Sequence, residues 1–108
     1  MALTINIYYS GKNGSALKFA NEMENGGIAE KIRQEKGNLR YEYFEMMRDK
    51  ETVLLIDSWE NQQALDLHHS SPIMKQIMEL REKYDIHMRV ERFTEITELP
   101  TDEKFIRK

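Results

Sequence analysis

The chain lacks cysteine, a long hydrophobic run and an excess of basic residues, and each absence excludes a class of protein. Without cysteine there is no disulfide, thiolate metal site, iron–sulfur cluster or cysteine nucleophile. The longest aliphatic run extends from Val53 to Ile56, far short of the roughly 20 residues that a membrane-spanning helix needs. The formal net charge is -3, so no basic surplus is available for nucleic-acid phosphates. We therefore expect no membrane span and no nucleic-acid partner.

The remaining composition is that of one small folded domain. The 108 residues are 40% hydrophobic and 32% charged, which is typical of a soluble globular protein of one domain. The first residues carry no charged segment ahead of an apolar stretch, so we expect no signal peptide and a cytoplasmic protein.

The hydrophobic pattern predicts the order of helices and strands. Strands with alternating apolar residues are predicted over residues 3–9, 39–47, 52–60 and 86–94. Helical spacing is found over residues 15–36, with a break at Gly26-Gly27. A second helix is predicted over residues 62–69, with Asn61 as its N-cap. The helix restarts at Ser71-Pro72, with Ser71 as N-cap, and continues to Tyr84. The resulting β-α-β-β-α-β order predicts an α+β, ferredoxin-like fold with a four-stranded antiparallel sheet.

The chain is expected to divide into a domain over residues 1–94 and a polar, charged tail over residues 95–108. Two apolar residues of the tail, Phe105 and Ile106, are candidates to anchor it on a partner subunit.

The third predicted strand is apolar on both of its faces. Val53, Leu55 and Trp59 share one face, while Leu54 and Ile56 lie on the other. Both helical segments of this fold cover the same side of the sheet, so a strand that is apolar on both sides needs a second cover. We infer a homodimer built sheet against sheet. The alternative is that a bulge offsets the alternation and that the strand is simply central.

The segment from residue 53 to residue 78 carries a resemblance to a known family. An Asp57-x-Trp59 pair is followed by Ala64-Leu65-x-x-His68 and then by Ser71-Pro72. This pattern, with the preceding stretch over residues 37–42, resembles the antibiotic biosynthesis monooxygenase family from residue 3 to about residue 94. The resemblance implies a dimeric α/β barrel with a pocket between the sheet and the helices of each subunit. Known members oxygenate electron-rich aromatic substrates such as quinols without metal or flavin, others degrade heme, and one branch isomerises a phosphorylated signalling sugar.

Three residues of this segment are candidates for chemistry. Asp57, next to Trp59 on one strand face, would have a raised pKa if buried and could act as a general base; the alternative is a surface acid near a strand end. Trp59 could stack on a planar substrate or could be ordinary core. His68 shares a helix face with Ala64 and Leu65, and it could be an acid–base group or a buried histidine bonded to a backbone carbonyl.

Three further residues are candidates to contact a substrate. Tyr41 and Tyr43 share the strand face of Leu39 and are predicted to point toward the helices, as hydrogen-bond donors or as core. Met78 could soften the pocket wall or belong to the core.

The heme-degrading relatives carry an iron-ligating histidine on the helix that matches residues 73–84. This chain has no histidine there, and Met78 lies near the matching position. His68 and His69 diverge by about 100° on a helix, so we expect no metal site. The resemblance implies a reaction without a cofactor.

Two classes of function fit these residues. The first is a cofactor-independent monooxygenase acting on a small aromatic or quinol-like substrate, with an isomerase of a small polar, phosphosugar-like metabolite as the enzymatic variant. The second is a non-catalytic dimer that binds a small molecule. Both require a small-molecule ligand and a homodimer.

Overall fold

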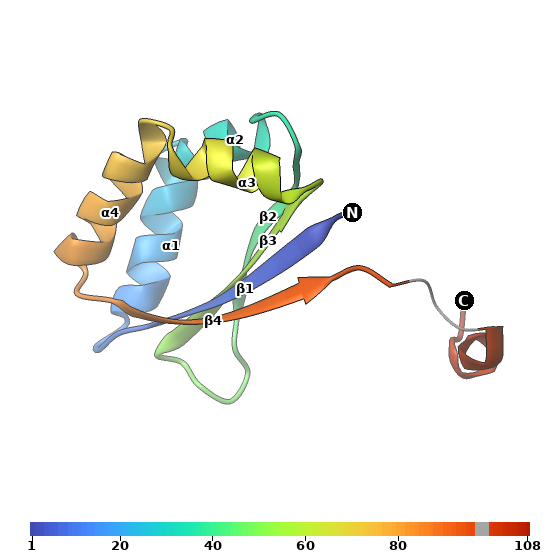
Figure 1. Cartoon of the computed structure of the whole chain (residues 1–108). Coiled ribbons are helices and arrows are strands. Elements are labelled where there is room, and N and C mark those ends of the chain that lie inside the picture. Colours follow the sequence, from blue (N-terminus) through green and yellow to red (C-terminus); the bar gives the residue numbers. More distant parts are fainter. Residues whose placement is uncertain (97–99) are drawn as a thin grey trace.

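The computed structural model of the chain describes residues 1–96 and 100–108 (Figure 1). Its strands are β1 (Leu3–Ser10), β2 (Asn38–Glu45), β3 (Thr52–Trp59) and β4 (His87–Thr94). Its helices are α1 (Ser15–Asn25), α2 (Ile28–Arg33), α3 (Gln62–His69) and α4 (Ile73–Lys83), with a short 3-10 helix η1 (Pro100–Phe105) in the tail. Within the described ranges, none of these helices has the length and the apolar character to cross a bilayer.

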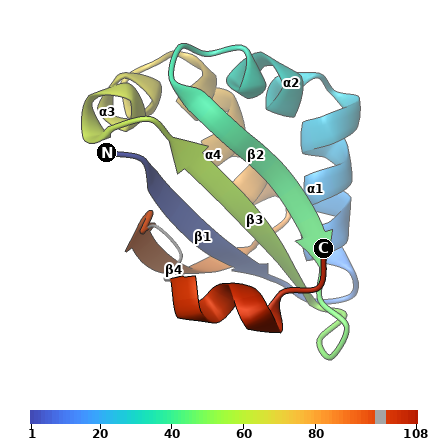
Figure 2. The same cartoon turned by 90° about the vertical axis from the view of Figure 1, so that its right-hand side faces the viewer.

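The four strands form one antiparallel sheet in the order β2-β3-β1-β4, which confirms the predicted α+β, ferredoxin-like fold. Helices α1 to α4 all lie on one side of this sheet (Figure 1), and the view from the other side shows the strands with these helices behind them (Figure 2). The core fills the space between the two layers, because every second strand residue points toward the helices. Its largest fully buried side chains are Trp59, Tyr9, Phe19, Met23, Ile32, Leu55, Ile77 and Val53.

The helix boundaries follow local sequence signals, with one exception. Gly27 adopts a left-handed φ of 79° and separates α1 from α2, as the two glycines predict. The Asn61 side chain accepts a hydrogen bond of 2.8 Å from the Ala64 N–H and caps α3, also as predicted. The prediction that Ser71 caps α4 is wrong. Its hydroxyl instead donates a hydrogen bond of 2.7 Å to the His68 carbonyl oxygen, at the end of α3.

A bulge at the start of β2 changes the direction of one predicted core residue. The pairing of β2 with β3 slips between Asn38 and Arg40, so the extra residue, Leu39, turns outward and is 58% exposed. The alternation predicted that Leu39 and Tyr41 both face the helices. This prediction is wrong for Leu39. Tyr41 and Tyr43 do point toward the helices and pack against the core.

The face of the sheet away from the helices carries an apolar row. Leu54 of β3 lies between Phe44 of β2 and Tyr8 of β1 in the strand register, and all three side chains are half-buried. Ile56 lies one row further along β3 on the same face and is also half-buried. The Arg89 guanidinium lies 4.0 Å from the centre of the Tyr8 ring, which is a cation–π contact. Strand β3 is thus apolar on both faces, as the sequence predicts.

Gly37 is required where β2 begins beneath α3, and its replacement by alanine is expected to destabilise the fold. Its φ is 88°, and an added Cβ would lie 2.6 Å from the Cβ of Ala64. Gly27 has a similar φ of 79° but open space around it, so Gly27→Ala isolates the backbone strain alone. We expect Gly27→Ala to cost about 1–2 kcal/mol and Gly37→Ala to cost about 1–3 kcal/mol more, because a close contact is added to the strain. Urea unfolding of both variants measures this difference, and equal losses would contradict the close contact.

Candidate functional site

A cluster of aromatic and polar side chains lies between the sheet and the helices, and it contains five of the six predicted site residues. Trp59, at the end of β3, stacks on the His68 ring of α3, with ring centroids 4.9 Å apart and an angle of 27° between the planes. Asp57 lies two residues before Trp59 on the same face, opposite Tyr41 of β2. The Tyr41 and Tyr43 hydroxyl oxygens are 3.3 Å apart. The alternation of β3 and the fold of α3 over its end therefore bring these residues together.

His68 is oriented by a carboxylate. Its Nδ1 lies 2.9 Å from Oε2 of Glu35, a residue in the turn between α2 and β2. Burial lowers the pKa of the His68 imidazole, and the neighbouring Glu35 opposes part of this shift. The ring is therefore neutral at pH 7, and since a carboxylate only accepts hydrogen bonds, Nδ1 carries the proton. Nε2 is then left with a lone pair, which is the arrangement of an oriented general base.

Asp57 is a buried carboxyl group whose Oδ1 has no hydrogen-bond partner among the described residues. Only 5% of its surface is exposed, and its Oδ1 accepts no hydrogen bond. Burial raises the pKa of Asp57 from 3.8 to about 7, because water no longer stabilises the charged form, and Glu35 adds to the increase. The nearby Trp59 indole N–H lowers this pKa in part. The indole nitrogen nevertheless makes no hydrogen bond within the usual distance and angle limits to any described residue. A carboxyl group with a pKa near 7 can accept or release a proton at neutral pH.

The tyrosines of the cluster remain protonated. Burial raises the pKa of Tyr9, Tyr41 and Tyr43 above 10. Tyr9 of β1 accepts a hydrogen bond of 3.0 Å at its hydroxyl oxygen from Nη2 of Arg81, and this guanidinium lowers the Tyr9 pKa in part. The cluster thus offers phenolic O–H groups that can donate to an oxygen atom of a ligand.

Met78 does not join this cluster. Its side chain is 59% exposed, because Ile77 and Leu80 occupy the positions of α4 that pack into the core. Met78 therefore does not belong to the core, and its role in a pocket wall stays a prediction.

Sequence reasoning missed Glu35, Tyr9 and Arg81. Glu35 lies in a run of charged residues at a helix end, which is typical of a solvated turn, and its partner His68 is 33 residues away. Arg81 lies on the polar-rich α4 and reaches Tyr9, 72 residues away. Only the tertiary fold creates these pairs, so no local spacing could have indicated them.

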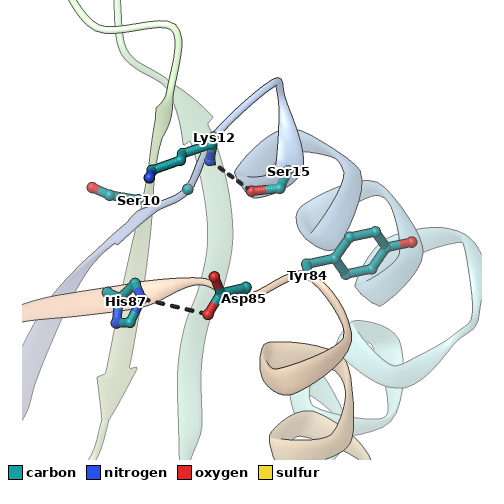
Figure 3. A pocket seen from close by; sticks show the side chains of 7 residues that line it. Ser10, Lys12, Ser15, Tyr84, Asp85 and His87 are labelled. Carbon is teal, nitrogen blue, oxygen red and sulfur yellow. Dashed lines mark hydrogen bonds and ion pairs between the residues drawn. The ribbon is translucent and has the colours of Figure 1, made fainter.

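Among the hollows of the described surface are four of about 240 to 350 Å³, and none of these four is lined by Asp57, Trp59 or His68. Figure 3 shows the one of about 340 Å³ where the loop after β1 meets the turn between α4 and β4. Basic and acidic residues both line this hollow. Lys12 belongs to the loop after β1, and Oδ1 of Asp85, in the turn between α4 and β4, lies 3.6 Å from Nε2 of His87. Of the cluster, Tyr43 lines the hollow of about 240 Å³, between α1 and the end of β2.

The role of Glu35 in orienting His68 predicts a measurable pKa change. Glu35→Gln removes the negative charge that raises the His68 pKa, so this pKa is expected to fall further. Nuclear magnetic resonance of the His68 imidazole carbons against pH measures the shift. Glu24→Gln is the control, because Glu24 pairs with Arg33 instead. An unchanged or higher His68 pKa in Glu35→Gln would show that the carboxylate does not act on this ring.

Comparison with known proteins identifies the family. The model of the family named antibiotic biosynthesis monooxygenase matches residues 2–80. The chain belongs to this family. No curated protein matches the chain in sequence.

Solved structures agree with this assignment at the level of the fold. A protein of Deinococcus radiodurans, to which antibiotic biosynthesis monooxygenase activity is attributed, superposes with a TM-score of 0.76 at 19% identity, over 92% of this chain and 96% of that one. SnoaB of Streptomyces nogalater, a cofactor-independent oxygenase, gives a TM-score of 0.74 at 13% identity, over 92% and 97% of the two chains. These two structures share the fold of this chain over 92% of its length, and identities this low establish the fold alone.

Proposed function

We propose that the protein is a cofactor-independent monooxygenase that acts on a small aromatic, quinol-like compound. The observation that carries this proposal is Asp57, a buried carboxyl group with a pKa of about 7 beside the Trp59 and His68 stack. The family assignment and the fold shared with SnoaB, itself a cofactor-independent oxygenase, support the same reaction class.

In this proposal the substrate supplies the electrons and the protein supplies a base and hydrogen bonds. Asp57 takes a proton from a substrate hydroxyl, and the resulting anion is electron-rich enough to react with dioxygen. Overall, a quinol and dioxygen give a hydroxyquinone and water, so all four electrons come from the quinol and no outside reductant is needed. Trp59 stacks on the ring, Tyr41 and Tyr43 donate hydrogen bonds to the developing oxyanion, and His68 accepts or returns the second proton.

The same proposal includes a homodimer formed through the face of the sheet opposite the helices. The half-buried row of Phe44, Leu54 and Tyr8 gives this face an apolar centre, and the surrounding charged residues give it a polar rim. In the tail, Phe105 is 80% exposed and Ile106 is 40% exposed, so both are available to contact a partner subunit.

Oxygen consumption tests the proposed reaction. A panel of quinols and dihydroxynaphthalenes is mixed with the metal-free protein, dioxygen is followed with an electrode, and the product mass is measured. At least one compound is expected to consume dioxygen and to give a product with one more oxygen atom and two fewer hydrogen atoms. His68→Gln is expected to slow this reaction. Absence of consumption with every compound, or an unchanged rate in both His68→Gln and Asp57→Asn, would overturn the proposal in favour of a non-catalytic binding protein.

A further inference from the structure

The chain contains two Asn-Gly sequences, and the first lies in the loop between β1 and α1. This is Asn13-Gly14, while Asn25-Gly26 lies where α1 ends. Glycine carries no side chain that would shield its backbone nitrogen, so the asparagine side chain before it can approach this nitrogen closely. Both asparagines are exposed. Each is therefore a candidate for a reaction between its side chain and the backbone.

The reaction is a deamidation, and water is its only co-reactant. The glycine N–H gives its proton to hydroxide, and the nitrogen attacks Cγ of the asparagine side chain to form a C–N bond. The side-chain nitrogen takes a proton from water and leaves as ammonia. Water then opens the succinimide ring at either carbonyl carbon, which gives aspartate or isoaspartate without any transfer of electrons. The rate depends on the loss of the N–H proton and on rotation about the Cα–C bond of the asparagine.

One carboxylate holds both amides of Asn13-Gly14. Glu51, in the turn that leads into β3, accepts a hydrogen bond of 2.6 Å at Oε2 from the Asn13 N–H and one of 2.9 Å at Oε1 from the Gly14 N–H. Asn13 has a left-handed φ of 57° and Gly14 one of 77°, and successive turn residues of this kind aim their N–H groups at a single anion. The backbone of Glu51 is also fixed, because its carbonyl oxygen accepts a hydrogen bond of 3.1 Å from the Gly11 N–H.

The two hydrogen bonds to Glu51 oppose both requirements of the reaction. A carboxylate 2.9 Å from the Gly14 nitrogen disfavours a second negative charge there, so this N–H loses its proton less readily. The two bonded N–H groups lie on either side of the Asn13 Cα–C bond. Rotation about that bond therefore breaks at least one charge-assisted hydrogen bond.

The second sequence, Asn25-Gly26, is held in a different way. The Gly26 N–H donates a hydrogen bond of 2.8 Å to the backbone carbonyl oxygen of Glu22, at the end of α1. This contact is made between backbone atoms, so a substitution of Glu51 leaves it in place. Asn25 is therefore an internal reference for Asn13 within the same molecule.

We propose that Asn13 is a deamidation site whose reaction is held back by the Glu51 carboxylate. The succinimide has no N–H at Gly14, and its opening leaves a new carboxylate beside that of Glu51, where the two negative charges repel each other. Deamidation thus weakens the contact between the turn before β3 and the start of α1. The modified loop borders the hollow of about 340 Å³ that Lys12 and Ser15 line (Figure 3).

Peptide mass spectrometry of Glu51→Ala after incubation at pH 8 tests the proposal. Asn13 of this variant is expected to deamidate at least about tenfold faster than in the wild type, because two hydrogen bonds to a charged group are lost. Asn25 is expected to keep its wild-type rate. Glu45→Ala is the matched control, because Glu45 is an exposed acid of the same hairpin, at the end of β2. An unchanged rate at Asn13 in Glu51→Ala, or an equal acceleration at Asn25, would overturn the proposal.

Hydrogen exchange of the Gly14 amide is a second test, since base-catalysed exchange requires the same loss of the N–H proton. In deuterium oxide, this amide is expected to exchange at least about tenfold more slowly in the wild type than in Glu51→Ala. Equal exchange rates contradict the proposed protection. A third comparison needs no variant. Asn13 of the wild-type chain is expected to react more slowly in buffer than in urea that unfolds the protein, and equal rates in both solutions refute the role of Glu51.

Discussion

Asp57→Asn is expected to lower the rate of substrate oxygenation at pH 8 by about 10²- to 10⁴-fold, the usual contribution of a general base. The wild-type rate should rise with pH through about 7, since the pKa of Asp57 lies there and only the ionised carboxylate accepts a proton. The asparagine variant should lose this rise. Initial rates of oxygen consumption from pH 5 to pH 9 measure both effects.

The same substitution is expected to stabilise the protein at alkaline pH. The pKa of Asp57 is about 7 in the folded chain and 3.8 in the unfolded one, so the folded state binds the proton more tightly. This difference in proton binding contributes up to roughly 4 kcal/mol to the free energy of unfolding. The contribution is fully present below pH 3.8 and is lost as pH rises through about 7. Asparagine has no such titration. At pH 8 Asp57→Asn should therefore unfold at higher urea concentration than the wild type, while near pH 4 the two should be similar.

Asp66→Asn is the control for both measurements. Asp66 lies exposed on α3, where it accepts a hydrogen bond from Gln62 within the same helix. Its replacement should leave the activity profile unchanged and should not raise stability at pH 8. If Asp57→Asn keeps the wild-type rate, Asp57 is not the base; if it is less stable than the wild type at pH 8, the carboxyl group is not desolvated as described.

Leu54→Glu is expected to convert the proposed homodimer into monomers. Leu54 lies at the centre of the apolar row between Phe44 and Tyr8, on the face that the helices leave open. A two-fold symmetric interface would bury the new carboxylate twice, and each unpaired buried charge costs several kcal/mol. The dimer dissociation constant should therefore rise by at least about 10³-fold. Sedimentation velocity over a concentration series measures this change.

Leu67→Glu provides the same substitution at a site outside the proposed interface. Leu67 is an exposed leucine of α3, on the opposite layer of the molecule from the open sheet face. This variant should sediment like the wild type. A wild-type protein that sediments as a 12.9 kDa particle at all concentrations would contradict the dimer.

The strands and helices were predictable because their signals are local. Alternation along 52–59 fixes both faces of β3, and the glycine pair at residues 26 and 27 marks the break between α1 and α2. Leu39 was misplaced because a bulge shifts the alternation by one residue, and nothing in the residue types on either side indicates the slip. Ser71 was misplaced because its hydroxyl has a nearby carbonyl, at the end of α3, as an alternative partner.

The candidate site was predictable only where its residues come from one segment. Asp57, Trp59 and His68 lie within twelve positions of one another, so strand alternation and helix spacing suffice to bring them together. Glu35 and Arg81 come from other elements, and their contacts exist only after α2 and α4 pack on the sheet. The environment of Asp57, including its burial, is likewise a property of the folded layers.

The ionisation of Asp57 is the most direct test of the account. The side-chain carboxyl carbon of Asp57, assigned by comparison with Asp57→Asn, can be followed by nuclear magnetic resonance from pH 3 to pH 9. A transition near pH 7 is the expected result, because burial beside Trp59 removes the water that would stabilise the charged carboxylate. A transition at or below pH 4 would show an ordinary solvated acid and would contradict an interior base.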